Sequence, residues 1–251
     1  MRSTLSMILA AGIFTIASPS LRADDQAAVK AVIDKAIKAH GADKLAKLKA
    51  LNMKMKGKFY GMGEGIDYAG EWNVQAPDKS RNEITGDVNG TKFTYIQIFN
   101  GDKGWVSING QTMDADKDTI AEAKEELYAS WVADLYPLKE KEFKLSPLGD
   151  SKVGDKEAVG IKVAHKDHRD VNLFFDKKSG YLIKQESRVK DPMAGGTEQS
   201  QESIYDDFKD VDGVKRPHKV LINRDGKKFV EGEVTEMKLL EKIEDSVFAK
   251  P

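Results

Sequence analysis

The densest group of residues able to do chemistry lies in one short segment, His165–Asp170, with two imidazoles and two carboxylates in six residues. Such groups bind zinc or another divalent ion, and a metal-bound water would then make the site a hydrolase. The segment also joins an apolar run that ends at Val163 to one that begins at Val171, which is typical of a solvated turn. We adopt the turn interpretation and expect no metal and no other cofactor.

Other catalytic motifs are weaker or absent. The run Gly61–Gly65 resembles a phosphate-binding loop, but its spacing differs from the dinucleotide fingerprint and a strand pattern follows where a helix is required. The sequence contains neither a Gly-x-Ser-x-Gly elbow nor a His-Glu-x-x-His helix. We therefore name no catalytic residue and expect a protein that is not an enzyme.

A stretch of lysines is the remaining charged feature, and after Asp43 no acidic residue interrupts it. Its members are Lys44, Lys47, Lys49, Lys54, Lys56 and Lys58. These cations could contact anionic lipid headgroups or an acidic partner. They are also typical of the solvated face of a helix and a strand.

Composition narrows the class of protein. The chain has 251 residues, of which 40% are hydrophobic and 32% charged, with a formal net charge of −1 and no cysteine. This balance gives no global electrostatic reason to expect a nucleic acid as partner. The lack of cysteine excludes disulfides, thiolate catalysis and cysteine-based zinc sites.

The N-terminus predicts export. Arg2 precedes an apolar run from Leu5 to Ala17, and Ser18–Ser20 ends that run shortly before Ala23. A run of about 13 residues is shorter than the roughly 20 that a membrane-spanning helix needs. We predict a signal peptide at residues 1–23, a single domain at residues 24–251, and a periplasmic protein that is not integral to a membrane.

Hydrophobic periodicity predicts the elements. Helical spacing covers Asp25–Leu48, and alternation with a period of two begins at Leu51 and recurs along the chain. Turn dipeptides separate the alternating runs: Asn89-Gly90, Asn100-Gly101, Asn109-Gly110, Gly154-Asp155, Ser179-Gly180, Asp212-Gly213 and Asp225-Gly226. Tight hairpins join antiparallel strands. We therefore predict a mainly β (α+β) fold with a curled antiparallel sheet of about ten or eleven strands.

One segment interrupts the strands. Residues Asp114–Leu138 carry apolar side chains at helical spacing, and Pro137 lies at the end of the segment. A sheet of this many strands must curl, so we expect this helix and the N-terminal helix to cover its concave face. The space between helix and sheet is either a filled core or a partly empty cavity for an apolar ligand.

Three short stretches resemble one known family. They are Ala39-His40-Gly41 with Lys44-Leu45, the segment Tyr205–Pro217, and Asp245–Phe248. Each is similar to a part of the bacterial extracytoplasmic proteins related to the outer-membrane lipoprotein-sorting carrier (LolA-like). Ala42 departs from the glycine that is frequent in the family at that position. The resemblance implies an incomplete antiparallel β-barrel whose cavity takes lipid chains.

Two functional hypotheses follow. The first is a periplasmic carrier or binding protein for a lipid or a lipidated protein, which acts as a monomer with partners in the inner or outer membrane. Its acyl chains would contact Trp72, Phe93, Tyr95, Phe99, Leu127, Trp131, Leu135, Leu173 and Phe175. The inserted helix and the loop Asp191–Gly196 would form a movable cover. The alternative is an envelope module with a packed core that senses stress or binds a protein through an edge strand or the lysines.

Overall fold

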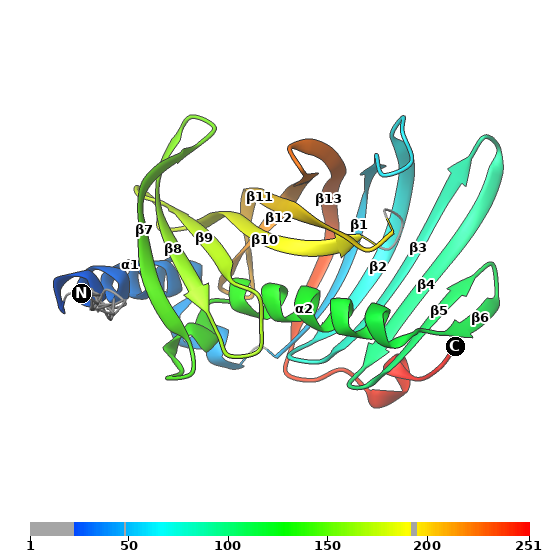
Figure 1. The fold of residues 1–251 in the computed structure, drawn as a ribbon, viewed down its shortest axis with the longest axis horizontal. Helices are drawn as coiled ribbons and strands as arrows, with labels where there is room; N and C mark the ends of the chain where they lie inside the picture. The colour runs from blue at the N-terminus through cyan, green and yellow to red at the C-terminus, as the bar shows by residue number, and fades with distance from the viewer. Residues whose placement is uncertain (1–22, 48, 192–194) are drawn as a thin grey trace, which may run out of the picture.

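The computed structural model describes residues 23–47, 49–191 and 195–251, which form one continuous antiparallel sheet and two α-helices (Figure 1). The predicted signal peptide, apart from Ala23, and residues 192–194 of the predicted cover lie outside the described residues. The sheet has thirteen strands in the order β6-β5-β4-β3-β2-β1-β13-β12-β11-β10-β9-β8-β7. The end strands β6 and β7 do not pair with each other, so the curled sheet stays open.

The first half of the sheet consists of sequential hairpins. Its strands are β1 (Ala50–Phe59), β2 (Ile66–Gln75), β3 (Lys79–Val88), β4 (Thr91–Asn100), β5 (Lys103–Ile108) and β6 (Gln111–Asp114). The second half comprises β7 (Lys144–Val153), β8 (Lys156–Ala164), β9 (Val171–Asp176), β10 (Leu182–Asp191), β11 (Thr197–Val211), β12 (Val214–Arg224) and β13 (Lys227–Leu240). Pairing of β1 with β13 joins the two halves.

The predicted turn dipeptides form the hairpins. Asn89 and Gly90 have φ angles of 54° and 82°, and Asp212 and Gly213 have 54° and 82°. Two consecutive positive φ angles are those of a type I′ turn, whose twist matches that of the flanking strands. The sheet nevertheless has more strands than the ten or eleven predicted. β6 has only four residues, and a register shift between Pro147 and Gly149 breaks the alternation in β7.

Helix α2 (Lys117–Ala133) lies within the predicted segment Asp114–Leu138 but is shorter at both ends. It begins where the Asp116 side chain accepts a hydrogen bond from the Thr119 backbone N–H at 2.7 Å, which caps the helix. It ends before Leu135, whose φ of 65° is not helical, and the 3₁₀ turn η2 (Tyr136–Lys139) follows.

Figure 1 shows α2 running across the sheet from the β6 side to the β7 side. We call the sheet face that α2 crosses the inner face and the opposite one the outer face.

Helix α1 (Ala23–His40) and the 3₁₀ helix η1 (Ala42–Lys47) form the N-terminal helical region that periodicity predicts as Asp25–Leu48. Gly41 separates them with a φ of 132°, and a Cβ atom there would lie 2.9 Å from the Gly213 carbonyl oxygen. Glycine is thus required both for the backbone conformation and for the close approach to the β11–β12 turn.

The largest apolar core lies at one end of the sheet. Val29, Ile33 and Ile37 of α1 pack there with Tyr128 and Val132 of α2. The inner-face side chains of β8, β9 and β10 complete this core, which contains Ile161, Val163, Val171, Leu173, Phe175 and Leu182. Both helices therefore cover the inner face at the β7–β10 end. A smaller cluster on the outer face contains Ile98, Ile243 and Phe248, the last from the C-terminal 3₁₀ turn η4 (Asp245–Phe248).

Candidate ligand-binding surface

An apolar surface without helix residues lies in the middle of the inner face. Buried Met55, Tyr68 and Val234 are its centre, and the partly buried residues around them are Met53, Phe59, Trp72, Ile84, Val220, Val230 and Met237. We call this set the apolar patch. All its members come from β1, β2, β3, β12 and β13.

The strand register places these side chains on one face. Met53 pairs with Trp72 of β2 and with Met237 of β13, so the three lie side by side across the sheet. Trp72 and Val74 are two residues apart and therefore point to the same face. Val74 packs with Ala123 and Leu127 of α2, which identifies that face as the inner one.

Glycines allow aromatic rings to pack closely against the backbone of the sheet on this surface. A Cβ atom at Gly70 would be 2.8 Å from the Trp72 ring, and one at Gly86 would be 2.6 Å from the Phe93 ring. Each ring therefore packs directly over the backbone of a neighbouring glycine. A side chain at that glycine would displace the ring. Tyr68 and Trp72 make an edge-to-face contact at 6.1 Å between ring centroids. The result is a broad apolar surface made largely of rings and methionines.

The nine residues predicted to line a cavity fall into three groups. Trp72, Phe93 and Tyr95 are partly exposed on the strands of the first half, in or beside the apolar patch. Phe99 and Leu127 are buried against each other where α2 meets β4.

The third group belongs to the core beneath both helices. Leu135, Leu173 and Phe175 are buried there, and Trp131 packs against them while partly exposed. Several members of the apolar patch were absent from the predicted set, among them Met53, Met55 and Phe59. Their alternation with Asn52, Lys54 and Lys56 along β1 was a visible indication.

A cavity of about 260 Å³ lies between α2 and strands β10–β13. Its lining includes Glu125, Glu126, Ser130, Gln185, Ser187, Gln201, Ser203, Tyr205, Ile222, Arg224 and Phe229. We call it the helix cavity. Ala129, Ala133, Arg188 and Val189 complete this lining, in which polar and apolar side chains are mixed.

Hydrogen bonds organise the floor of the helix cavity. The Tyr205 hydroxyl donates to Gln185 Oε1 at 2.9 Å, and Gln185 Nε2 donates to the Ala129 carbonyl oxygen of α2 at 3.0 Å. Burial raises the pKa of Tyr205 to about 12, so this hydroxyl keeps its proton at neutral pH. Arg224 Nε donates to Gln201 Oε1 at 2.9 Å, and the guanidinium lies 3.8 Å from the Phe229 ring centroid.

The segment that suggested a metal site instead holds α2 in place. His168 Nδ1 lies 3.0 Å from Glu125 Oε1, and the His168 ring stacks on Tyr128 at 4.0 Å. Arg169 binds both carboxylate oxygens of Glu122, at 2.9 and 2.5 Å. Within the described parts of the chain no group of three potential ligands could hold a metal ion.

The electrostatics of this attachment favour charged Glu122. Burial alone would raise the pKa of Glu122, but the hydrogen bonds from Arg169 and from the Lys190 backbone N–H hold it below its ordinary value. At the other end of α2, Asp134 accepts a hydrogen bond from Arg216 at 2.8 Å. Charged pairs therefore attach the helix to the rest of the protein at Glu122 in its first half and at Asp134, its C-cap.

The lysines of β1 point to the outer face, and two of the three are paired with carboxylates. Lys54 lies 2.9 Å from Glu236 of β13, and Lys58 lies 2.7 Å from Asp67 of β2. These cross-strand pairs neutralise two of the six lysines of the basic stretch, as expected for a solvated face.

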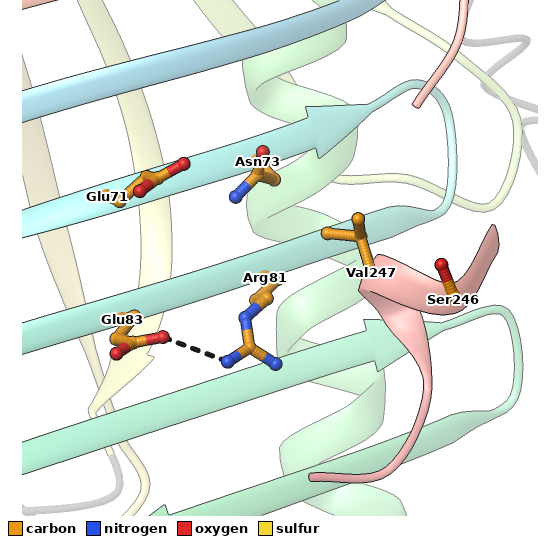
Figure 2. Close-up of a pocket in the computed structure, with 6 residues that line it drawn as sticks. All are labelled: Glu71, Asn73, Arg81, Glu83, Ser246 and Val247. Atoms are coloured by element: carbon orange, nitrogen blue, oxygen red, sulfur yellow. Dashed lines mark hydrogen bonds and ion pairs between the residues drawn. The ribbon is translucent and has the colours of Figure 1, made fainter. Parts of the chain in front are cut away.

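A second cavity, of about 400 Å³, lies on the outer face beside the C-terminal turn (Figure 2). Glu71, Asn73, Arg81, Glu83, Ser246 and Val247 line it. Arg81 pairs with Glu83 at 2.9 Å, and Asn52 Nδ2 donates to Glu71 Oε1 at 2.5 Å. The charged groups of this cavity, Glu71, Arg81 and Glu83, thus already have partners.

The described chain is an open, curled antiparallel sheet crossed by one helix, and this architecture occurs in solved structures. It is similar to a LolA superfamily protein from Nitrosomonas europaea, with a TM-score of 0.55 and 14% identity over 88% of this chain and 97% of that chain. A DUF1329 family protein from Desulfovibrio piger gives a TM-score of 0.54 and 12% identity with the same coverage.

A putative outer membrane lipoprotein-sorting protein domain from Vibrio parahaemolyticus gives a TM-score of 0.51 at 12% identity, over 88% of this chain and 97% of that one. The chain therefore has a LolA-like fold, as the sequence resemblance implied. No family model and no curated protein matches the sequence. None of the helices in the described ranges has the length and apolar character needed to span a bilayer.

Proposed function

We propose that this chain is a periplasmic carrier or binding protein for the acyl chains of a lipid or a lipidated protein. The observation that carries this proposal is the apolar patch, whose side chains come from five strands and are joined by no helix residue. Apolar surface gathered on the hollow side of a curled sheet is typical of a binding site. Binding needs neither a metal nor a covalent step.

Three further observations support the proposal. The N-terminal sequence has the pattern of a secretory signal peptide at residues 1–23, which would direct the protein to the periplasm. The LolA-like fold is shared with a domain described as an outer-membrane lipoprotein-sorting protein. Trp72, Phe93 and Tyr95 are partly exposed beside the place where Phe99 and Leu127 join α2 to the sheet. In this proposal Trp72, Phe93 and Tyr95 contact the acyl chain, and α2 covers it.

The alternative, a module that binds proteins through its lysines, has less support. Lys54 and Lys58 are each paired with a carboxylate, so they present little uncompensated charge to an acidic partner.

A pair of neighbouring substitutions tests the proposal. Ile84 points to the inner face within the apolar patch, and Thr85 follows it on the same strand with an exposed side chain on the outer face. Ile84→Glu places a carboxylate where the acyl chain would have to desolvate it, so affinity for a fluorescent long-chain fatty acyl probe should fall by about tenfold or more. Thr85→Glu adds the same charge on the outer face and should leave affinity unchanged.

Native mass spectrometry of protein purified from the periplasm should also show a retained lipid or lipopeptide. A wild-type protein that carries none and does not bind the acyl probe would refute the proposal. Equal loss of affinity in both variants would place the binding surface elsewhere.

A further inference from the structure

The helix cavity and the apolar patch adjoin each other. Phe229 lines the cavity and packs edge-on against Phe59 of the patch, with 5.1 Å between ring centroids. Ile222 also lines the cavity and is the cross-strand partner of Val230, a patch residue. A ligand lying on the patch can therefore extend into the cavity without leaving the inner face.

The two neighbouring surfaces differ in chemistry. The patch presents hydrocarbon, sulfur and aromatic rings, whereas the helix cavity presents serine hydroxyls and glutamine amides. The side chains of Ser130 and Ser187 make no hydrogen bond within the described parts of the chain. These hydroxyls remain available to donate to, and accept from, a ligand.

The charges of the helix cavity balance locally. Arg224 lies 3.8 Å from Glu126, and Glu125 accepts hydrogen bonds from the Arg169 backbone N–H and from His168. Arg188 also lines the cavity, and its guanidinium pairs with Glu198 at 2.5 Å. An anionic group entering the cavity would therefore meet two carboxylates, and two guanidiniums that already have acidic partners. A neutral group would meet donors and acceptors at no such cost.

We propose that the helix cavity binds the uncharged polar end of an amphipathic ligand, a group that bears hydroxyls or an amide, while its chain lies on the apolar patch. The volume of about 260 Å³ suits one small group of this kind, such as a glycerol ester or an amide. This inference rests on the proposed function and specifies its ligand: acyl chains joined to a neutral head, in preference to fatty acids or phosphate-bearing lipids.

The test compares four probes with the same 14-carbon chain: monomyristoylglycerol, myristoyl ethanolamide, myristic acid and the corresponding lysophosphatidic acid. Displacement of a bound apolar dye measures the affinity of each. Wild-type protein should bind the two neutral probes about tenfold more tightly than the two anions. The double variant Ser130→Ala/Ser187→Ala should lose this preference while it keeps its affinity for the dye.

Ser246→Ala is the matched control, since Ser246 is an exposed serine at the outer-face cavity. It should keep the wild-type preference. Equal affinity for all four probes, tighter binding of the anions, or a double variant that behaves like wild type would overturn the inference while leaving acyl binding established. Failure of every probe and of the dye to bind would instead reject the proposed function itself.

Discussion

His40 provides a quantitative test of the packing at the end of α1. Its Nδ1 donates to the Lys215 carbonyl oxygen at 2.9 Å, and its Nε2 accepts from the Leu182 backbone N–H at 3.0 Å. The residue is only 6% exposed, and its ring meets that of Tyr181 edge-on at 5.3 Å. The hydrogen bond from Leu182 requires the neutral imidazole, because a protonated Nε2 cannot accept.

Burial is the main cause that lowers the pKa of His40, from 6.5 to about 4. The unfolded chain therefore binds a proton more readily than the folded one between these two values. Stability is at its full value above pH 6.5 and falls as the pH drops towards 4. The whole shift corresponds to about 3 kcal/mol, of which about 2 kcal/mol should be lost between pH 7 and pH 5.

The assay is urea unfolding of the wild type and His40→Gln at pH 7 and pH 5. The variant should be less stable at pH 7 by about 1–3 kcal/mol, because the hydrogen bonds of the imidazole are lost or distorted. Its stability should change little between the two pH values, since it has no imidazole to protonate at this site. An equal loss of stability in both proteins, or an NMR titration of His40 with a midpoint above pH 6, would refute the reasoning.

Two further predictions concern α2. Asp116→Ala removes the side chain that caps the Thr119 N–H, so it should lower the free energy of unfolding by about 1 kcal/mol, measured by urea denaturation; an unchanged midpoint would contradict the capping role. Glu122→Gln breaks the charged pair with Arg169, so backbone amides of α2 should exchange with deuterium faster while those of α1 do not, and equal protection in both proteins would show that the pair does not hold the helix.

Local features of this fold could be predicted because local chemistry specifies them. The Asn-Gly and Asp-Gly dipeptides form turns wherever they occur between alternating runs, and Gly41 ends α1 because only glycine tolerates its φ and its contact with Gly213. The helical period of α2 was equally visible, although Asp116 and Leu135 set narrower limits than the apolar pattern indicated.

The apolar patch was harder to predict because it depends on register and on tertiary placement. A bulge between Val234 and Glu236 shifts the alternation of β13. Met237 therefore points to the inner face like Val234, although the two residues are three positions apart and not two or four. The helix cavity was even less apparent from the amino-acid sequence. Ser187 and Ser203 lie on strands that carry polar residues on both faces, a pattern that resembles a fully solvated strand.

The geometry of α2 explains why one half of the inner face is covered and the middle is not. Ile120 of α2 packs near β2 and β4, whereas Val132 packs in the core of β8–β10. These residues are about 18 Å apart along the helix. From β4 to β9 the sheet order crosses eight strand spacings, an arc of about 38 Å. A straight helix can join two strands so far apart along the sheet only as a chord across its curl. The intervening strands β1 and β13, which bear most of the apolar patch, then lie away from the helix, whereas β12 reaches it through the long side chains of Arg216 and Arg224. In this proposal an acyl chain would fill the place that packed helix side chains fill at the β7–β10 end.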